Sequence, residues 1–325
     1  MTQHAISATR RALLGLAALP LAAPALAQTS SYPSRPLRLL VGFGAGGIGD
    51  LVARIAAEGM SQVLGQSIVI ENRTGAGGNI AFETAARATP DGYTLVIANV
   101  AGLAVNPVLM PSASFDATRD LVTVAPLAMT PHVLVVKPDF ATDLPHLLAR
   151  ARAGGDINWS TAGVGSSPHQ TMLLAQSLGQ ARFTPVHYRS GALGVQAVLT
   201  GEVQVTSEAT AVVVEHIRAG TLRGLAACST ERLALLPEVP TTGEAGVPGL
   251  TNGSNAGIAV PRGVPEAIRA RLAEAIAQAL ELPSVRERLA RQGTSAMAGD
   301  AASFDAFVES ERLRWRPLLT GLAPA

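Results

Sequence analysis

The segment L-R-L-L-V-G-F-G-A-G-G-I-G-D, residues 37–50, joins an apolar run to a helical pattern through five glycines. The run at 37–41 predicts a short buried strand, and apolar residues at helical spacing predict a helix that begins at Asp50. Glycines let the backbone approach a ligand closely, and a helix start carries unpaired N–H groups and a positive dipole end. The segment therefore predicts an anion-binding turn, suited to a pyrophosphate or to a carboxylate.

Strand and helix patterns alternate along the rest of the chain, which predicts an α/β fold with mixed sheets. Residues 72–79 and 163–169 form two further glycine-rich turns between a strand and a helix. We expect two hinged lobes with a crevice between them. Lobe 1 is predicted to comprise residues 28–126 plus 254–325, and lobe 2 residues 127–253.

Three other segments carry local predictions. Residues 99–106 read as a small-residue loop that Pro107 closes, and residues 242–245 as a short helix. Residues 121–137 contain two extended runs, which we interpret as the crossing into the second lobe.

The N-terminal residues 1–27 resemble a cleavable export signal. Arg10 and Arg11 precede an apolar stretch and an Ala-Leu-Ala cleavage site, in an arrangement that also suits the twin-arginine route. We therefore expect a periplasmic protein. Removing this segment takes the formal charge of the 325-residue chain from +1 to −1, which gives no reason to expect a nucleic-acid partner.

A nicotinamide-dependent oxidoreductase is the main alternative from the residues alone. Gly42, Gly44 and Gly47 match G-x-G-x-x-G after a strand, and Glu71 stands where a ribose-binding acid belongs. Against this reading, further glycines lengthen the turn, the other two loops repeat its character, and no hydride-transfer partner is evident. The residues indicate no metal site, no cofactor and no nucleophile elbow.

Eight motifs follow one another along the chain: F-G-A-G-G-I-G-D (43–50), E-N-R-T-G-A-G-G-N-I (71–80), P-D-G-Y-T-L (90–95), A-V-N-P (104–107), G-V-G-S-S-P-H (163–169), H-Y-R-S-G-A (187–192), L-P-E-V-P-T (236–241) and V-P-R-G-V-P (260–265). Together they resemble one family, the Bug-type periplasmic receptors of tripartite tricarboxylate transporters. The resemblance covers essentially the whole chain after the signal.

The resemblance implies a two-lobe, Venus-flytrap binding protein without catalysis, monomeric, which holds a small organic acid and delivers it to membrane subunits. A receptor that serves a sensor partner instead is a further alternative. The ligand-binding residues that the resemblance implies are Phe43, Gly44, Ala45, Gly46, Gly47, Gly49, Asp50, Gly78, Asn79, Asn99, Ala101, Gly165, Ser166, Ser167, His169, Tyr188, Ser190, Gly191 and Glu208.

The chain also departs from the family pattern. Family members usually carry Thr or Ser where Gly49 stands, often prolines at Gly44 and Ala45, and often Asp where Glu208 stands. The usual tryptophan before the return strand is absent, and residues 252–255 are polar. A hydroxyl and an aromatic wall are therefore missing, and the usual ligands of the family are not assumed for this chain.

Overall fold

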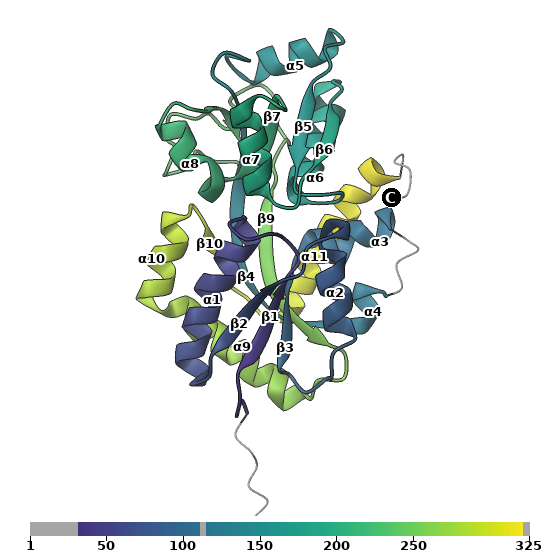
Figure 1. Cartoon of the computed structure of the whole chain (residues 1–325), viewed down its shortest axis with the longest axis vertical. Coiled ribbons are helices and arrows are strands. Elements are labelled where there is room, and N and C mark those ends of the chain that lie inside the picture. Colours follow the sequence, from purple (N-terminus) through teal and green to yellow (C-terminus); the bar gives the residue numbers. More distant parts are fainter. Residues whose placement is uncertain (1–31, 111–114, 321–325) are drawn as a thin grey trace, which may run out of the picture. The chain divides into compact units, whose positions relative to one another are not determined.

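A mixed sheet of ten strands organises the described part of the chain, residues 32–110 and 115–320 of a computed structural model (Figure 1). The predicted signal, residues 1–27, lies outside the described residues. The strand order is β2-β1-β3-β9-β4-β7-β5-β6, and β8 and β10 pair with β4. This arrangement confirms the predicted α/β class with mixed sheets.

The first half of the sheet combines parallel and antiparallel pairs. β1 pairs in parallel with β2 and β3, whereas β9 runs antiparallel between β3 and β4. Its strands are β1 (Leu37–Val41), β2 (Ile68–Asn72), β3 (Thr94–Ala98), β9 (Gly253–Pro261) and β10 (Ser295–Ala296). Its helices are α1 (Ile48–Leu64), α2 (Asn79–Ala86), α3 (Asn106–Leu109), α4 (Ala117–Asp120), α9 (Glu266–Glu281), α10 (Pro283–Arg291) and α11 (Ala301–Leu319), with short turns η1 (Ala76–Gly78) and η2 (Ala101–Val105).

The second half has the same alternation of strand and helix. β5 pairs in parallel with β6 and β7, and β7 and β8 pair antiparallel with β4. Its strands are β5 (Asn158–Thr161), β6 (Thr184–His187), β7 (Val205–Ala209) and β8 (Arg223–Ala227). Its helices are α5 (Leu144–Arg152), α6 (Ser167–Gly179), α7 (Gly191–Thr200) and α8 (Thr210–Arg218).

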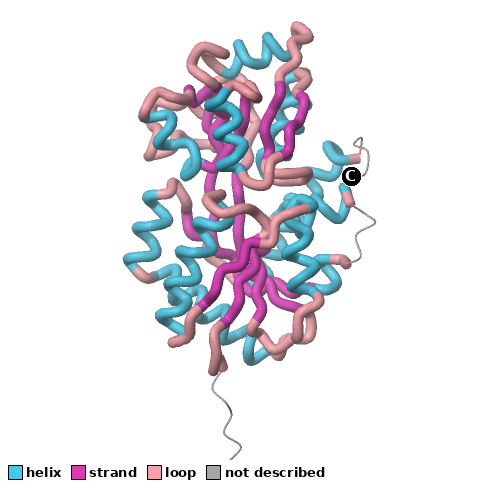
Figure 2. Tube along the Cα trace, viewed as in Figure 1, coloured by secondary structure: helices cyan, strands magenta, loops and turns pink. Residues whose placement is uncertain are grey.

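β4 (Leu121–Val136) belongs to both halves. Residues 121–131 pair with β9, and residues 132–136 pair with β7 and β8. The register with β9 shifts beside Pro126, where a bulge accommodates a residue that has no N–H to donate. The two extended runs predicted in this segment therefore form one continuous strand, which Figure 2 shows passing between the two groups of strands.

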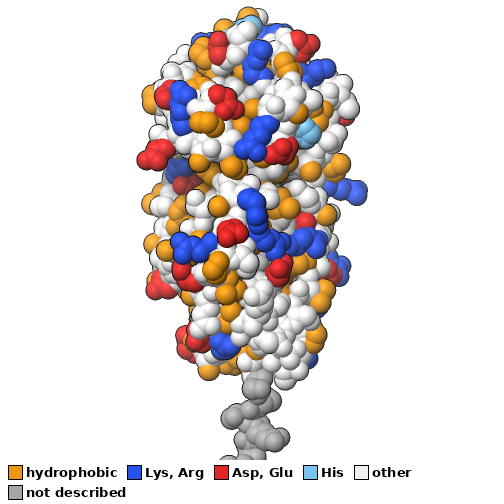
Figure 3. Space-filling model, turned by 90° about the vertical axis from the view of Figure 1, so that its left-hand side faces the viewer, with side chains coloured by type: hydrophobic (Ala, Val, Ile, Leu, Met, Phe, Trp, Pro, Cys, Tyr) orange, Lys and Arg blue, Asp and Glu red, His pale blue; other side chains and the backbone are white. Residues whose placement is uncertain are grey.

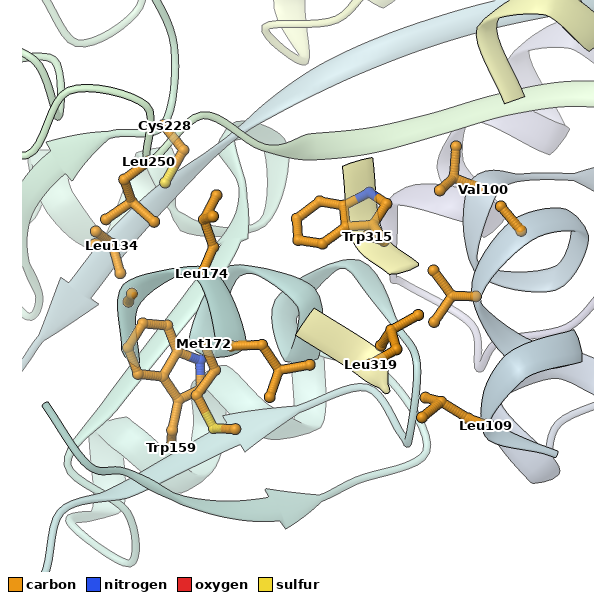
Figure 4. Packing of buried hydrophobic residues seen from close by; sticks show 14 of the residues in the cluster. Val100, Leu109, Leu134, Trp159, Met172, Leu174, Cys228, Leu250, Trp315 and Leu319 are labelled. Atoms are coloured by element: carbon orange, nitrogen blue, oxygen red, sulfur yellow. The ribbon is translucent and has the colours of Figure 1, made fainter. Parts of the chain in front are cut away.

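One apolar cluster continues from the first half into the second. The buried side chains of Trp315 and Leu319 on α11 belong to it, together with Val100 from the first half and Trp159 from the second. Figure 4 shows Trp315 between the side chains of Val100 and Leu174. The C-terminal helix thus packs against both halves. On the surface, positive and negative side chains are interspersed over the face shown in Figure 3.

Two local predictions were wrong. Residues 101–105 form the π-helical turn η2 and continue into α3, because their small side chains are buried and the Asn99 carboxamide oxygen accepts from the Gly102 N–H (2.8 Å). Residues 242–245 form a turn, tied by the N–H of Val247 donating to the carbonyl of Thr242 (2.8 Å). The lobe boundaries at residues 126–127 and 253–254 stay a prediction.

Candidate functional site

The α1 loop, residues 43–49, follows β1 and includes the start of α1. α1 begins at Ile48, two residues before the predicted start at Asp50. Its N-cap is Gly47 in an extended conformation, and within residues 32–110 no side chain caps this helix. The first N–H groups of α1 are therefore available to a ligand.

A buried carboxylate holds the α1 loop from behind. Asp50 is 3 % exposed, and its carboxylate accepts from the Gly46 N–H (3.1 Å), the Asn72 side-chain amide (3.0 Å) and the Arg54 guanidinium (2.9 and 3.0 Å). Burial alone would raise the pKa of this carboxyl, but the hydrogen bonds and the Arg54 charge hold the pKa below its usual range. Asp50 thus positions the loop and is neutralised by Arg54.

The α6 loop, residues 163–167, is the counterpart in the second half. Ser166 is the N-cap of α6, but its hydroxyl donates to the Gly163 carbonyl (2.7 Å), and no described side chain caps the helix start. The Nδ1 atom of His169 accepts from the Gly165 N–H (3.1 Å), and the Gln170 side-chain amide donates to the Gly165 carbonyl (2.8 Å). Neutral groups therefore hold this loop.

His169 is buried beneath the α6 loop beside a second imidazole. Its ring centroid lies 5.3 Å from that of His187 at an angle of 88°. Burial, with a smaller contribution from His187, lowers the pKa of His169 to about 4. The imidazole is therefore neutral at physiological pH and can act as the acceptor for the Gly165 N–H.

A third helix start, that of α7, lies against a buried acid. The N-cap Ser190 accepts from the Leu193 N–H, and the Tyr188 hydroxyl donates to the Glu202 carboxylate (2.8 Å) on the surface. Gly191, the first residue of α7, lies against the Glu208 carboxyl: a Cβ there would be 2.3 Å from Oε1. Only glycine leaves room for the Glu208 side chain at this point.

A pocket lies among these loops. Nine predicted residues line it: Phe43, Gly47, Gly49, Asn99, Ala101, Ser166, Ser167, Gly191 and Glu208. The structure places ten predicted residues outside the lining: Gly44, Ala45, Gly46, Asp50, Gly78, Asn79, Gly165, His169, Tyr188 and Ser190. The remaining lining residues were not predicted: Ile48, Val52, Ile97, Ala128, Ala162, Pro168, Ser254, Asn255 and Ala256.

The unpredicted lining comes largely from strands β3, β4 and β9, whose apolar patterns read only as core. Asn255 accepts from the Val100 N–H (2.8 Å), and the Ser254 hydroxyl is 2.9 Å from Nε2 of His132. The polar run at residues 252–255, where the family usually has a tryptophan, was the one sequence signal that pointed to this wall. Of this run, Ser254 and Asn255 line the same cavity as the helix starts.

Direct contacts close the cavity between the two halves. The Gly44 N–H donates to the Arg189 carbonyl (3.1 Å). A Cβ at Gly77 would lie 2.2 Å from the Val164 carbonyl oxygen, so the backbones approach closely there. Asn106 lies at the same seam, where its amide donates to the Gly77 carbonyl (3.1 Å) and to the Asn79 side chain (2.7 Å).

Glu208 is the one ionisable side chain among the described lining residues, and that lining contains no Lys, Arg or His. It is 3 % exposed, and the Ala209 N–H donates to its Oε2 (3.3 Å). Burial raises the pKa of Glu208 to about 8. An anion in this cavity would therefore meet backbone donors and a neutral acid.

The arrangement around Glu71 does not favour a ribose. Its carboxylate forms ion pairs with Arg38 (2.7 Å) and with Arg73. No group of three or more His, Cys, Asp or Glu side chains is arranged to hold a metal within residues 32–110 and 115–320. In the same residues, no helix combines the length and apolar character needed to cross a bilayer.

Comparisons with known proteins agree with these features. Residues 52–323 match the family described as tripartite tricarboxylate transporter family receptor. Protein BugT of Bordetella pertussis is 35 % identical over 303 residues, which cover 92 % of each chain. MatC from Rhodopseudomonas palustris with bound malate is 31 % identical, with a TM-score of 0.84 over 89 % of this chain and all of that one. An R. palustris protein with adipate is 30 % identical, with a TM-score of 0.86 over 90 % of this chain and all of that one.

Proposed function

The chain belongs to the tripartite tricarboxylate transporter receptor family, and from this premise we propose that it binds a small carboxylate in the cavity between its two halves. The family consists of binding proteins, so the oxidoreductase alternative is set aside. The observation that carries the proposal is the pair of uncapped helix starts, α1 and α6, that face one cavity whose described lining contains no cation.

Helix starts suit a carboxylate because they offer several fixed N–H donors and a favourable dipole end. Hydrogen bonds from such donors to an ionised group are about twice as strong as those between neutral groups. The apolar side chains of Val52, Ile97 and Pro168 would contact the carbon skeleton of the ligand. We expect a micromolar affinity, about −8 kcal/mol.

The proposed role is that of a periplasmic receptor that delivers its ligand to the membrane subunits of a tripartite transporter. The export pattern at residues 1–27 and the family support this location and partner. A ligand that contacts both halves favours the closed form, because only that form provides all its donors. The hydrogen bond from the Gly44 N–H to the Arg189 carbonyl also stabilises the closed form, and it does so without contacting the ligand.

A thermal-shift screen at pH 6.5 tests the proposal on protein unfolded and refolded to remove bound ligand. The probes are acetate, butyrate, succinate, malate, adipate, benzoate and glutamate. At least one carboxylate should raise the melting temperature and bind measurably by calorimetry. A screen without a binder would contradict the proposal.

Replacing a single backbone donor locates the binding site. Ile48→Pro removes the first N–H of α1 but leaves the helix intact, since proline suits this position and Gly47 is already extended. We expect affinity to fall about tenfold with little change in melting temperature. Ala301→Pro makes the same change at the start of α11, outside the cavity lining, and should leave affinity unchanged. Equal affinities for both variants would place the ligand elsewhere.

A further inference from the structure

Glu208 lies buried against the first residue of α7, so the helix dipole is the main support that an ionised carboxylate would have there. Its side chain is buried, lines the cavity and lies against the backbone of Gly191. Its hydrogen bond from the Ala209 N–H is long, at 3.3 Å, and no cation belongs to the described lining. A buried charge without a partner is costly, so the neutral acid is favoured at this position.

We propose that Glu208 faces the cavity as a neutral carboxylic acid and donates its proton in a hydrogen bond to the carboxylate of the ligand. The inference rests on the proposed function and extends it to one residue and one ligand class. A neutral acid adds a donor opposite the helix starts, whereas an ionised Glu208 would repel the ligand. The preferred ligand is then a carboxylate that carries no ammonium group at this end, since an ammonium would instead favour the ionised side chain.

The other titratable groups around β7 are buried imidazoles or lie toward the surface. On β4, burial lowers the pKa of His132 to about 3, and on α6 the pKa of His169 is about 4. Both imidazoles are therefore neutral throughout this range. The described residues of β5, α7 and β9 carry no titratable side chain. On α8, Glu215, His216 and Arg218 lie in the last turns, toward the surface.

The inference makes binding depend on pH in one direction. The pKa of Glu208 in the free protein is raised to about 8 by burial. The binding-competent, protonated form is complete below that pH and is depleted above it. Affinity for a carboxylate should therefore be constant from pH 6.5 to 7 and fall by about tenfold per pH unit well above pH 8.

Calorimetric titration tests this with the carboxylate of the screen that gives the largest shift, at pH 6.5, 7.5, 8.5 and 9.5. The wild-type protein should lose affinity above pH 8. Glu208→Gln keeps a donor of similar shape but cannot titrate, so affinity at pH 7 should fall about threefold to tenfold and then stay constant to pH 9.5. Glu215→Gln, whose side chain is 77 % exposed on α8, should keep the wild-type profile.

The outcomes separate this inference from the proposed function. A screen without any binder removes both. A binder whose wild-type affinity is constant to pH 9.5 overturns only the role of Glu208. So does glutamate as the strongest binder with an affinity that rises with pH, because Glu208 would then be an ionised partner for an ammonium group.

Discussion

The α1 loop and the α6 loop present the same backbone donors to the cavity but are held in place by different chemistry. A buried ionised carboxylate, Asp50, holds the α1 loop and is neutralised by Arg54. Neutral groups, His169 and Gln170, hold the α6 loop. Neither support leaves a net charge facing the cavity. An anion site built from weak dipoles requires that no such charge be present. The two supports should therefore fail under different conditions.

Protonation of the two buried histidines in mild acid should have the largest effect on the free energy of unfolding. It should act on the second half of the molecule first. The pKa of His169 is lowered to about 4 and that of His132 to about 3, so the unfolded chain binds more protons than the folded one below pH 6.5. Stability from these groups is complete above pH 6.5 and is lost as the pH falls toward the folded values. The loss is roughly 1.4 kcal/mol per pH unit for each histidine that must become charged.

Urea unfolding at pH 7, 5.5 and 4.5 measures this loss, and His169→Gln should make it smaller. The lowered pKa of Asp50 has a different window: its contribution is present above the ordinary value of 3.8 and is lost only below it. Glu208, whose pKa is raised to about 8, gains stability as the pH falls and offsets part of the wild-type loss, so the comparison of the two proteins is diagnostic. A His169→Gln variant that loses as much free energy of unfolding as the wild type between pH 7 and 4.5 would contradict the assignment of a buried, neutral His169.

Removing Asp50, the ionic support of the α1 loop, should have the next largest effect on the free energy of unfolding. Asp50→Ala leaves the Gly46 N–H, the Asn72 amide and the Arg54 guanidinium without their acceptor. Since Arg54 is half-exposed and can reach water, we expect a loss of about 2 kcal/mol in the free energy of unfolding. Ligand affinity should also fall, because the α1 loop loses its anchor.

Denaturant unfolding and calorimetry provide the two measurements. Glu58→Ala on the same helix breaks an exposed ion pair with Arg288 and should cost less than about 0.5 kcal/mol. Equal losses for the two variants would show that Asp50 does not support the loop.

The contact between the two halves should matter for affinity more than for stability. Gly44→Pro removes the N–H that donates to the Arg189 carbonyl. The closed form should lose about 1 kcal/mol, which lowers ligand affinity about fivefold. Gly44→Ala keeps the N–H but places a Cβ 3.1 Å from that of Ser190, and so measures crowding alone. If alanine and proline lower affinity equally, the hydrogen bond does not contribute.

The smallest change concerns the hydroxyl that family members usually carry at residue 49. A Cβ at Gly49 would lie at an ordinary 3.9 Å from the side chains of Phe43 and Val41, so serine can be accommodated. Gly49→Ser should stabilise α1 by about 0.5 kcal/mol and change ligand affinity no more than about threefold. Gly49→Ala separates the helix effect from that of the hydroxyl, by comparison of melting temperatures and affinities. Complete loss of binding in the serine variant would contradict the open position of residue 49.

Local sequence predicted the strands and helix starts well, because glycine turns and apolar periodicity are set by neighbours along the chain. The predicted start of α7, Gly191, matches the structure. The predicted start of α1, Asp50, lies two residues after the observed start at Ile48. The resemblance placed nine residues that line the cavity, Ser166 and Glu208 among them. The resemblance did not distinguish these lining residues from residues such as His169, which lies behind its loop. Along a loop, residues that face a cavity alternate with residues that support the loop.

By itself, the sequence determined the class of fold, the receptor family and the repeated design of glycine turn and helix start. The tertiary structure decided which groups share the cavity. Insertion of β9 between β3 and β4 brings Ser254 and Asn255 to the helix starts, and packing against Gly191 buries Glu208. The charge state of a side chain depends on the solvent and dipoles around it in space, and those neighbours come from distant parts of the chain.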